Sequence, residues 1–131
     1  MSGTWVLDSQ ALSLYLRADR TMTARLAAAL RHDVRVVTSA VTLVEADPQG
    51  AHRARMDWAL PRLTVEPVTK ETAARAVALL RETGNSGGHK YALDAIVAAT
   101  ARAASGPVTV LTSDVDDLVP LCGKGVTVLK A

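Results

Sequence analysis

Short apolar runs alternate along this chain with longer segments in which apolar residues recur every three or four positions. The short runs, rich in Val, Leu and Thr, predict five β-strands, at residues 4–8, 34–39, 63–68, 107–113 and 125–131. The longer segments predict helices at residues 9–18, 21–32, 40–46, 51–60, 69–84 and 89–104. Strands that alternate with helices in this way predict an α/β fold with a parallel sheet covered on both faces.

Several of the predicted helices carry signals for where they begin or end. Ser9 is a candidate N-cap for the first helix, and Thr69 for the helix at 69–84, which Gly84 is expected to stop. Pro61 is expected to close the helix at 51–60. The helix at 89–104 is almost wholly apolar and is therefore predicted to be central.

Length and composition narrow the class of protein. A chain of 131 residues with an apolar share of 49% can bury a real core, so we expect one domain over residues 1–131. No apolar stretch reaches the roughly 18 residues that a membrane helix needs, and the first residues lack a signal-type pattern. Cys122 is the single cysteine, which suits a reducing compartment. We therefore expect a cytoplasmic protein without membrane association.

Acidic residues follow the ends of three predicted strands. Asp8 closes the first strand, and Asp114 stands just past the fourth, with Asp116 and Asp117 behind it. Glu45 lies six residues beyond the end of the second strand, about one and a half turns along the next helix. Ligands of open parallel sheets sit beyond the carboxyl ends of the strands. These acids are therefore expected to converge at one edge of the sheet.

A further acid, Asp94, lies inside the apolar helix at 89–104. Its neighbours in sequence include Leu93, Ile96 and Val97, an environment that is costly for an unpaired charge. Lys90, four residues earlier, is a candidate partner on the same helix face.

Each acid also has an ordinary structural explanation. Asp8 could cap its helix, and Glu45 could be a solvated helix residue. Asp114 could be an N-cap, with Asp117 completing a box-like pattern three residues on. Ser113 and Asp116 offer the same pattern one residue earlier.

The combination of acids favours chemistry over these separate explanations. Like charges packed a few ångströms apart raise each other's pKa unless a cation neutralises them. A cluster of oxygen ligands without Cys or paired His suits Mg²⁺ or Mn²⁺ rather than zinc. Such ions activate water and stabilise the attacking and leaving oxygens of phosphodiester cleavage. The pattern therefore predicts a metal-dependent nuclease.

The charge balance agrees with a polyanionic substrate. The chain has fifteen basic and thirteen acidic residues, a net charge of +2. Five of the clustered acids can be set aside: Asp8, Glu45, Asp94, Asp114 and Asp117. Eight acids then remain against fifteen bases, a surplus of seven positive charges on the remaining surface. Arg53, Arg55 and Arg62 are candidates for phosphate contact, although ordinary solvated helix residues would look the same. With no Phe, two Trp and two Tyr, binding of single strands by aromatic stacking is disfavoured.

Four stretches together carry a resemblance to a known family: "WVLDSQALSLYL", "VTSAVTLVEA", "YALDAIVAATA" and "VLTSDVDDL". In this order and at this spacing they resemble the PIN domain, and most closely the VapC-type toxins of bacterial toxin–antitoxin pairs. The resemblance covers nearly the whole chain. It implies a three-layer α/β/α sandwich with a central, mainly parallel sheet of five strands.

The resemblance also assigns roles to individual residues. The family's four regular acids, which form its catalytic set, fall on Asp8, Glu45, Asp94 and Asp114. A less regular fifth acid falls on Asp116 or Asp117, of which we favour Asp117. Of these, the metal ligands are expected to be Asp8, Asp94, Asp114 and Asp117, whereas Glu45 holds a second metal or orients the attacking water.

Residues around these acids are expected to position the substrate or water. Ser9 follows the first acid and Thr112 lies in the last motif, where the family has hydroxyl residues. Lys90 and His89 are expected near the mouth of the site, although helix-start packing is the favoured reading of His89. Gln10 stands where a small residue is more usual in the family, a mild departure.

The resemblance finally implies a function and its partners. It implies Mg²⁺- or Mn²⁺-dependent endoribonuclease activity, often on tRNA or ribosomal RNA, in a homodimer inhibited by a small cognate antitoxin. A catalytically silent PIN fold that binds RNA or protein is the alternative. A haloacid-dehalogenase-like phosphatase would have an acid where Gln10 stands, and a phospho-receiver domain would end its third strand in Asp, where this chain has Pro67 and Val68.

Overall fold

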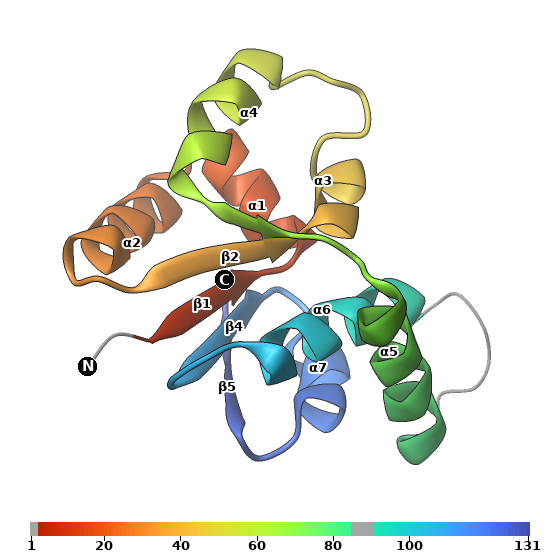
Figure 1. Cartoon of the computed structure of the whole chain (residues 1–131). Coiled ribbons are helices and arrows are strands. Elements are labelled where there is room, and N and C mark those ends of the chain that lie inside the picture. The colour runs from red at the N-terminus through yellow and green to blue at the C-terminus, as the bar shows by residue number, and fades with distance from the viewer. Residues whose placement is uncertain (1–2, 85–90) are drawn as a thin grey trace.

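The computed structural model, which describes residues 3–84 and 91–131, contains a central five-stranded sheet (Figure 1). The strands lie in the order β3-β2-β1-β4-β5, and every neighbouring pair is parallel. Their bounds are β1 Thr4–Leu7, β2 Arg35–Ser39, β3 Thr64–Glu66, β4 Val108–Thr112 and β5 Val126–Lys130. The five predicted strands are confirmed, each shorter than predicted by one to three residues.

Helices cover both faces of the sheet, as Figure 1 shows, with α1 to α4 on one side and α5 to α7 on the other. Their bounds are α1 Ser9–Leu16, α2 Arg20–Arg31, α3 Ala40–Ala46, α4 Arg53–Ala59, α5 Lys70–Glu82, α6 Ala92–Ala103 and α7 Val115–Cys122. A short 3-10 helix, Leu60–Arg62, joins α4 to β3. The three-layer α/β/α sandwich is confirmed.

The core consists of two apolar clusters, one on each face of the sheet. Because side chains alternate along a strand, Val6 of the central strand β1 belongs to one cluster and its neighbour Leu7 to the other. Both side chains are fully buried. The apolar α6 packs into the first cluster and is central, as its sequence predicts.

Some element ends differ from the prediction for identifiable reasons. Helix α1 stops at Leu16 rather than at residue 18, because Ala18 adopts a positive φ of 59° that a right-handed helix cannot accommodate. Pro61 does not close α4 directly but lies in the following 3-10 helix. Ser9 is not the cap of α1: it is the first helical residue, and Asp8 is the N-cap. Thr69 caps α5 as predicted, accepting a hydrogen bond from the Thr72 backbone N–H.

The strand order reverses at the central strand β1. From β1 the chain proceeds to β2 and β3 on one side of the sheet and later to β4 and β5 on the other. Ligands of such sheets bind beyond the carboxyl ends of the strands where the order reverses, here β1 and β4. In the ranges that the structure describes, no helix is both long enough and apolar enough to span a bilayer.

Candidate active site

Asp8 is the most buried acid at the carboxyl edge of the sheet, with 3% of its surface exposed. It follows β1 directly, and its backbone N–H donates to the Leu111 carbonyl of β4. One carboxylate oxygen accepts a hydrogen bond from the Ala11 backbone N–H at 2.9 Å, which caps α1. Burial raises the pKa of Asp8 above its ordinary value, and the charge of Asp114 adds to this effect. The carboxylate is thus held in place in a site that disfavours its charge.

Thr112 connects Asp8 to the next strand. It ends β4, its side chain is wholly buried, and its hydroxyl donates to the second carboxylate oxygen of Asp8. The same hydroxyl accepts a hydrogen bond from the Asp114 backbone N–H at 2.9 Å. Both hydrogen bonds of the Thr112 hydroxyl are therefore with acidic residues, to the side chain of Asp8 and from the backbone of Asp114. Its predicted role toward substrate stays a prediction, whereas its role in orienting Asp8 and the Asp114 turn is observed.

Asp94 lies in the first turn of α6 and is the point around which the other acids gather. Its pKa is raised from 3.8 to about 6, first by burial and then by four carboxylates, those of Asp114, Asp117, Asp8 and Glu45. Together with Asp94, these carboxylates come from four separate segments of the chain. The predicted convergence of the acids at one edge of the sheet therefore agrees with the structure.

The remaining acids differ in exposure. Asp114 occupies the N-cap position of α7, but its side chain makes no capping hydrogen bond, so capping does not occupy its carboxylate. Glu45, near the end of α3, and Asp116 are exposed, and Asp117 is half-buried. Asp117 contributes to the raised pKa of Asp94, whereas Asp116 is not among the causes of that shift. The choice of Asp117 as the fifth acid of the site stays a prediction.

Two predicted site residues cannot be placed. Lys90 and His89 lie outside the described residues, and so does the proposed pairing of Lys90 with Asp94. Ser9 is the first residue of α1, half-buried and directly after Asp8.

The donor set fits a hard divalent cation in type and charge. The gathered ligands are all carboxylates, the kind of ligand that Mg²⁺ and Mn²⁺ prefer. Among the described residues, however, no three His, Cys, Asp or Glu side chains are positioned to ligate one ion together. Asp8 is fixed by two hydrogen bonds, whereas the Asp114 side chain is exposed and makes no capping hydrogen bond. A cation at this edge would relieve the repulsion that raises the pKa of Asp94.

Sequence reasoning did not select Lys130 as a site residue. Lys130 ends β5, and its ammonium group donates to the carbonyl of Ser113 at 3.0 Å, directly before Asp114 in the chain. A basic residue at the carboxyl end of an apolar strand was the signal that could have identified it.

Two of the three arginines that are candidates for phosphate contact lie around an aromatic residue of α4, whereas Arg53, at the start of that helix, lines a hollow beside Pro48 and Gly50. The guanidinium carbons of Arg55 and Arg62 lie 3.8 and 4.0 Å from the ring centroid of Trp58. Arg55 also donates to the Tyr15 carbonyl of α1. Arg55 thus links α4 to α1, whereas Arg62 packs on Trp58, and contact of the arginines with phosphate stays a prediction.

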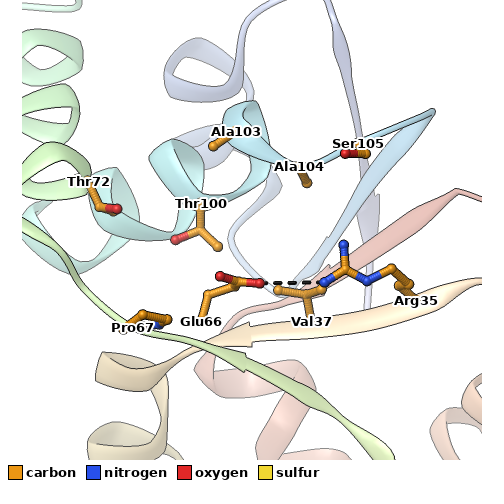
Figure 2. A pocket seen from close by; sticks show the side chains of 9 residues that line it. All are labelled: Arg35, Val37, Glu66, Pro67, Thr72, Thr100, Ala103, Ala104 and Ser105. Atoms are coloured by element: carbon orange, nitrogen blue, oxygen red, sulfur yellow. Dashed lines mark ion pairs between the residues drawn. The ribbon is translucent and has the colours of Figure 1, made fainter.

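A separate hollow of about 130 Å³ lies away from the acids (Figure 2). An ion pair between Arg35 and Glu66, 3.5 Å apart, crosses it, and Thr100 and Ser105 line it from the end of α6 that is distant from Asp94. Both charged side chains of the pair are about half exposed. The hollow contains none of the predicted site residues.

The fold and the acid cluster together define a PIN-type α/β/α domain. A model of the PIN domain matches residues 5–118, and the chain belongs to this family.

Solved structures agree with the family assignment. The chain is similar to VapBC2 from Rickettsia felis bound to a DNA fragment from their promoter, with a TM-score of 0.75 and 14% identity over 98% of both chains. It is also similar to FitAB bound to the IR36 DNA fragment, with a TM-score of 0.72 and 23% identity over 96% of this chain and 94% of that one. It is similar as well to FitAcB from Neisseria gonorrhoeae, with a TM-score of 0.67 and 23% identity over 95% of both chains. At these identities the likeness shows the fold, and no curated protein matches this chain.

Proposed function

We propose that this protein is a Mg²⁺- or Mn²⁺-dependent endoribonuclease and the toxin of a type II toxin–antitoxin pair. PIN domains are generally nucleases, which gives the starting point. The observation that carries the proposal for this chain is the pKa of Asp94, raised to about 6 with four further carboxylates among the causes. A cluster of like charges at the carboxyl edge of a parallel sheet is costly unless a cation binds there.

Asp8, Asp94 and Asp114 would hold a divalent ion, and Asp117 would support them or hold a second one. When bound, Mg²⁺ or Mn²⁺ polarises the phosphoryl oxygens and makes water a better nucleophile at neutral pH. Thr112 keeps the Asp8 carboxylate turned toward the site through its hydroxyl. Glu45 orients the attacking water, and Ser9 together with Lys90 contacts the scissile region. In-line attack on phosphorus leaves a 5′-phosphate and a 3′-hydroxyl.

Partners follow from the same proposal. The structures similar to this chain include VapBC2 and FitAB, each bound to a DNA fragment, and the resemblance of the sequence to VapC-type toxins implies a small antitoxin. We therefore propose a small cognate antitoxin that inhibits this chain, and a homodimer as the working form in the cytoplasm. The surplus of seven positive charges outside the acid cluster supports RNA, with tRNA or ribosomal RNA as the candidate targets.

The direct test is cleavage of labelled RNA by purified protein with Mn²⁺, with Mg²⁺ and with EDTA. Wild type should cleave with either metal and not in EDTA. Asp8→Asn removes the charge but keeps a side chain that caps a helix as well as Asp does, so it should fold and lose at least about 100-fold in rate. Asp57→Asn, on the exposed surface of α4, serves as the matched control and should cleave like wild type.

The outcomes separate the two candidate functions. Cleavage by wild type that persists unchanged in Asp8→Asn would refute the assigned site. No cleavage of any RNA by folded, metal-loaded wild type would favour the alternative, a silent PIN fold that binds RNA or protein.

The toxin assignment is tested in cells. Expression of the chain alone should arrest growth, and co-expression of the small protein encoded next to it should relieve the arrest. Normal growth with abundant, folded and cleavage-competent protein would contradict the toxin assignment while leaving the nuclease assignment intact.

A further inference from the structure

Lys130 is placed at the edge of the acid cluster by the register of the sheet. In the parallel pair of β4 and β5, Lys130 lies directly beside Thr112, the residue that holds Asp8. Its ammonium group reaches over the end of β4 and donates to the Ser113 carbonyl at 3.0 Å. The side chain is exposed, so it faces solvent at the same edge of the sheet as the acids.

Lys130 lines a surface hollow together with three aspartates. This hollow of about 340 Å³ is lined by Ser113, Val115, Lys130 and the three aspartates that follow β4, Asp114, Asp116 and Asp117. Lys130 is the one basic residue in that lining, and no ion pair with an aspartate is found for it among the described residues. An ammonium group has three N–H donors, and the Ser113 carbonyl accepts from one of them. Two donors therefore remain for another acceptor.

We propose that Lys130 binds a backbone phosphate of the RNA next to the one that is cleaved. The inference rests on the proposed ribonuclease function and extends it to a substrate contact. A phosphate that approaches three aspartates meets repulsion, and Lys130 is the basic residue that lines this hollow in the part of the chain that the structure describes. An exposed, flexible ammonium group is suited to hold a phosphate as a point charge.

The strand order indicates which phosphate is bound. Asp8 follows β1 and Lys130 ends β5, two strands away across β4. Neighbouring strands lie about 4.8 Å apart, so the backbone of Lys130 is about 10 Å from the strand that carries Asp8. Lys130 thus contacts a flanking phosphate, and the RNA crosses the carboxyl ends of the strands from β1 toward the edge strand β5.

A purely structural role for Lys130 makes different predictions. If it only fastens the turn at Ser113, its loss should disturb Asp114, lowering the affinity for Mn²⁺ and kcat. If it binds phosphate, its loss should raise KM and weaken the dependence of RNA binding on salt.

The test compares Lys130→Met and Lys130→Arg with Lys124→Met, which removes the same charge from the turn before β5, at the opposite end of that strand. Cleavage of a short single-stranded oligoribonucleotide is measured with Mn²⁺ at several NaCl concentrations. Lys130→Met should raise KM roughly three- to tenfold with kcat changed less than twofold, as for one exposed charge contact. The slope of log KM against log salt should decrease by about 0.7, the value for one phosphate on a single strand. Lys130→Arg should restore both, and Lys124→Met should match wild type.

Failure of the inference is distinguishable from failure of the proposed function. If wild type cleaves and Lys130→Met retains its KM and salt slope, the phosphate contact is refuted and the nuclease stands. If Lys130→Met lowers kcat and Mn²⁺ affinity but keeps the salt slope, the role of Lys130 is to hold the turn, and the proposal is again refuted. If wild type cleaves no RNA, the proposal fails with the function on which it rests.

Discussion

Removing the charge of Asp94 should stabilise the metal-free protein. In Asp94→Asn the half-buried carboxylate becomes a neutral amide of nearly the same shape, and its repulsion with Asp114, Asp117, Asp8 and Glu45 disappears. The variant tests whether the acids are close enough to destabilise one another.

The magnitude follows from the shifted pKa. A rise from 3.8 to about 6 corresponds to about 3 kcal/mol between the two protonation states. Asp94 is partly exposed, so solvent screening reduces this figure, and Asn loses about 0.5 kcal/mol of favourable interaction with the start of α6. We expect the free energy of unfolding to increase by about 1–2 kcal/mol at pH 7.5 in EDTA.

The pH dependence has a definite sign. Between pH 3.8 and about 6 the folded protein keeps a proton on Asp94 that the unfolded chain has lost, so wild-type stability falls as pH rises through this window. The advantage of Asp94→Asn should therefore be small at pH 4, grow up to about pH 7 and stay constant above it. Saturating Mn²⁺ should reverse the order of stabilities, because the metal stabilises wild type and binds the variant less.

Urea unfolding followed by circular dichroism, in EDTA and in Mn²⁺, measures these differences. Asp116→Asn is the control, since Asp116 is exposed and is not a cause of the raised pKa of Asp94; it should change the free energy of unfolding by less than about 0.5 kcal/mol. Equal or lower stability of Asp94→Asn in EDTA at pH 7.5 would refute the electrostatic reasoning.

Three further outcomes are expected. At subsaturating Mn²⁺, wild-type cleavage should rise with pH through about 6 as Asp94 loses its proton; a flat profile between pH 5 and 8 in stopped assays would contradict this. Thr112→Val should lower the free energy of unfolding by about 1–3 kcal/mol and reduce kcat, because Asp8 loses a buried hydrogen-bond donor. Thr112→Ser should retain the stability and kcat of wild type. Equal urea midpoints and cleavage rates for the two variants would count against the observed hydrogen bond. Trp58→Ala should destabilise the protein by about 1–3 kcal/mol, because the contacts of Trp58 with Arg55, Arg62 and Tyr15 are lost. Urea unfolding measures this loss, and cleavage assays should show an unchanged kcat. An unchanged stability would show that α4 is held by other contacts.

Much of the fold could be predicted because local pattern and tertiary structure agree. The five strands were marked by short apolar runs, and Thr69 by its place before a periodic segment. The ends of elements were less predictable, because they depend on single backbone angles such as the positive φ of Ala18. Ser9 and Asp8 are both candidates for the cap of α1 in the sequence; the cap is Asp8, because β1 ends one residue earlier than predicted.

The approach of Asp8 and Asp114 could be predicted from their positions after parallel strands, since topology alone brings those ends together, whereas Asp94 was marked by its apolar helix. What could not be predicted is how each side chain is held. The hydrogen bond from Thr112 to Asp8 joins residues 104 positions apart and depends on the pairing of β1 with β4. The approach of Lys130 to Ser113 likewise depends on the register of β5, which no local pattern specifies.

The double use of Asp8 bears on how such a protein can evolve. Its carboxylate both begins α1 and belongs to the acid cluster, and Asn performs the first task as well as Asp does. One base change in the codon exchanges the two residues. If the protein is the proposed nuclease, a lineage can therefore abolish cleavage at this position without first passing through a poorly folded intermediate, and the rest of its surface would be unchanged. Related chains with Asn at position 8 would thus be candidates for binding proteins descended from nucleases.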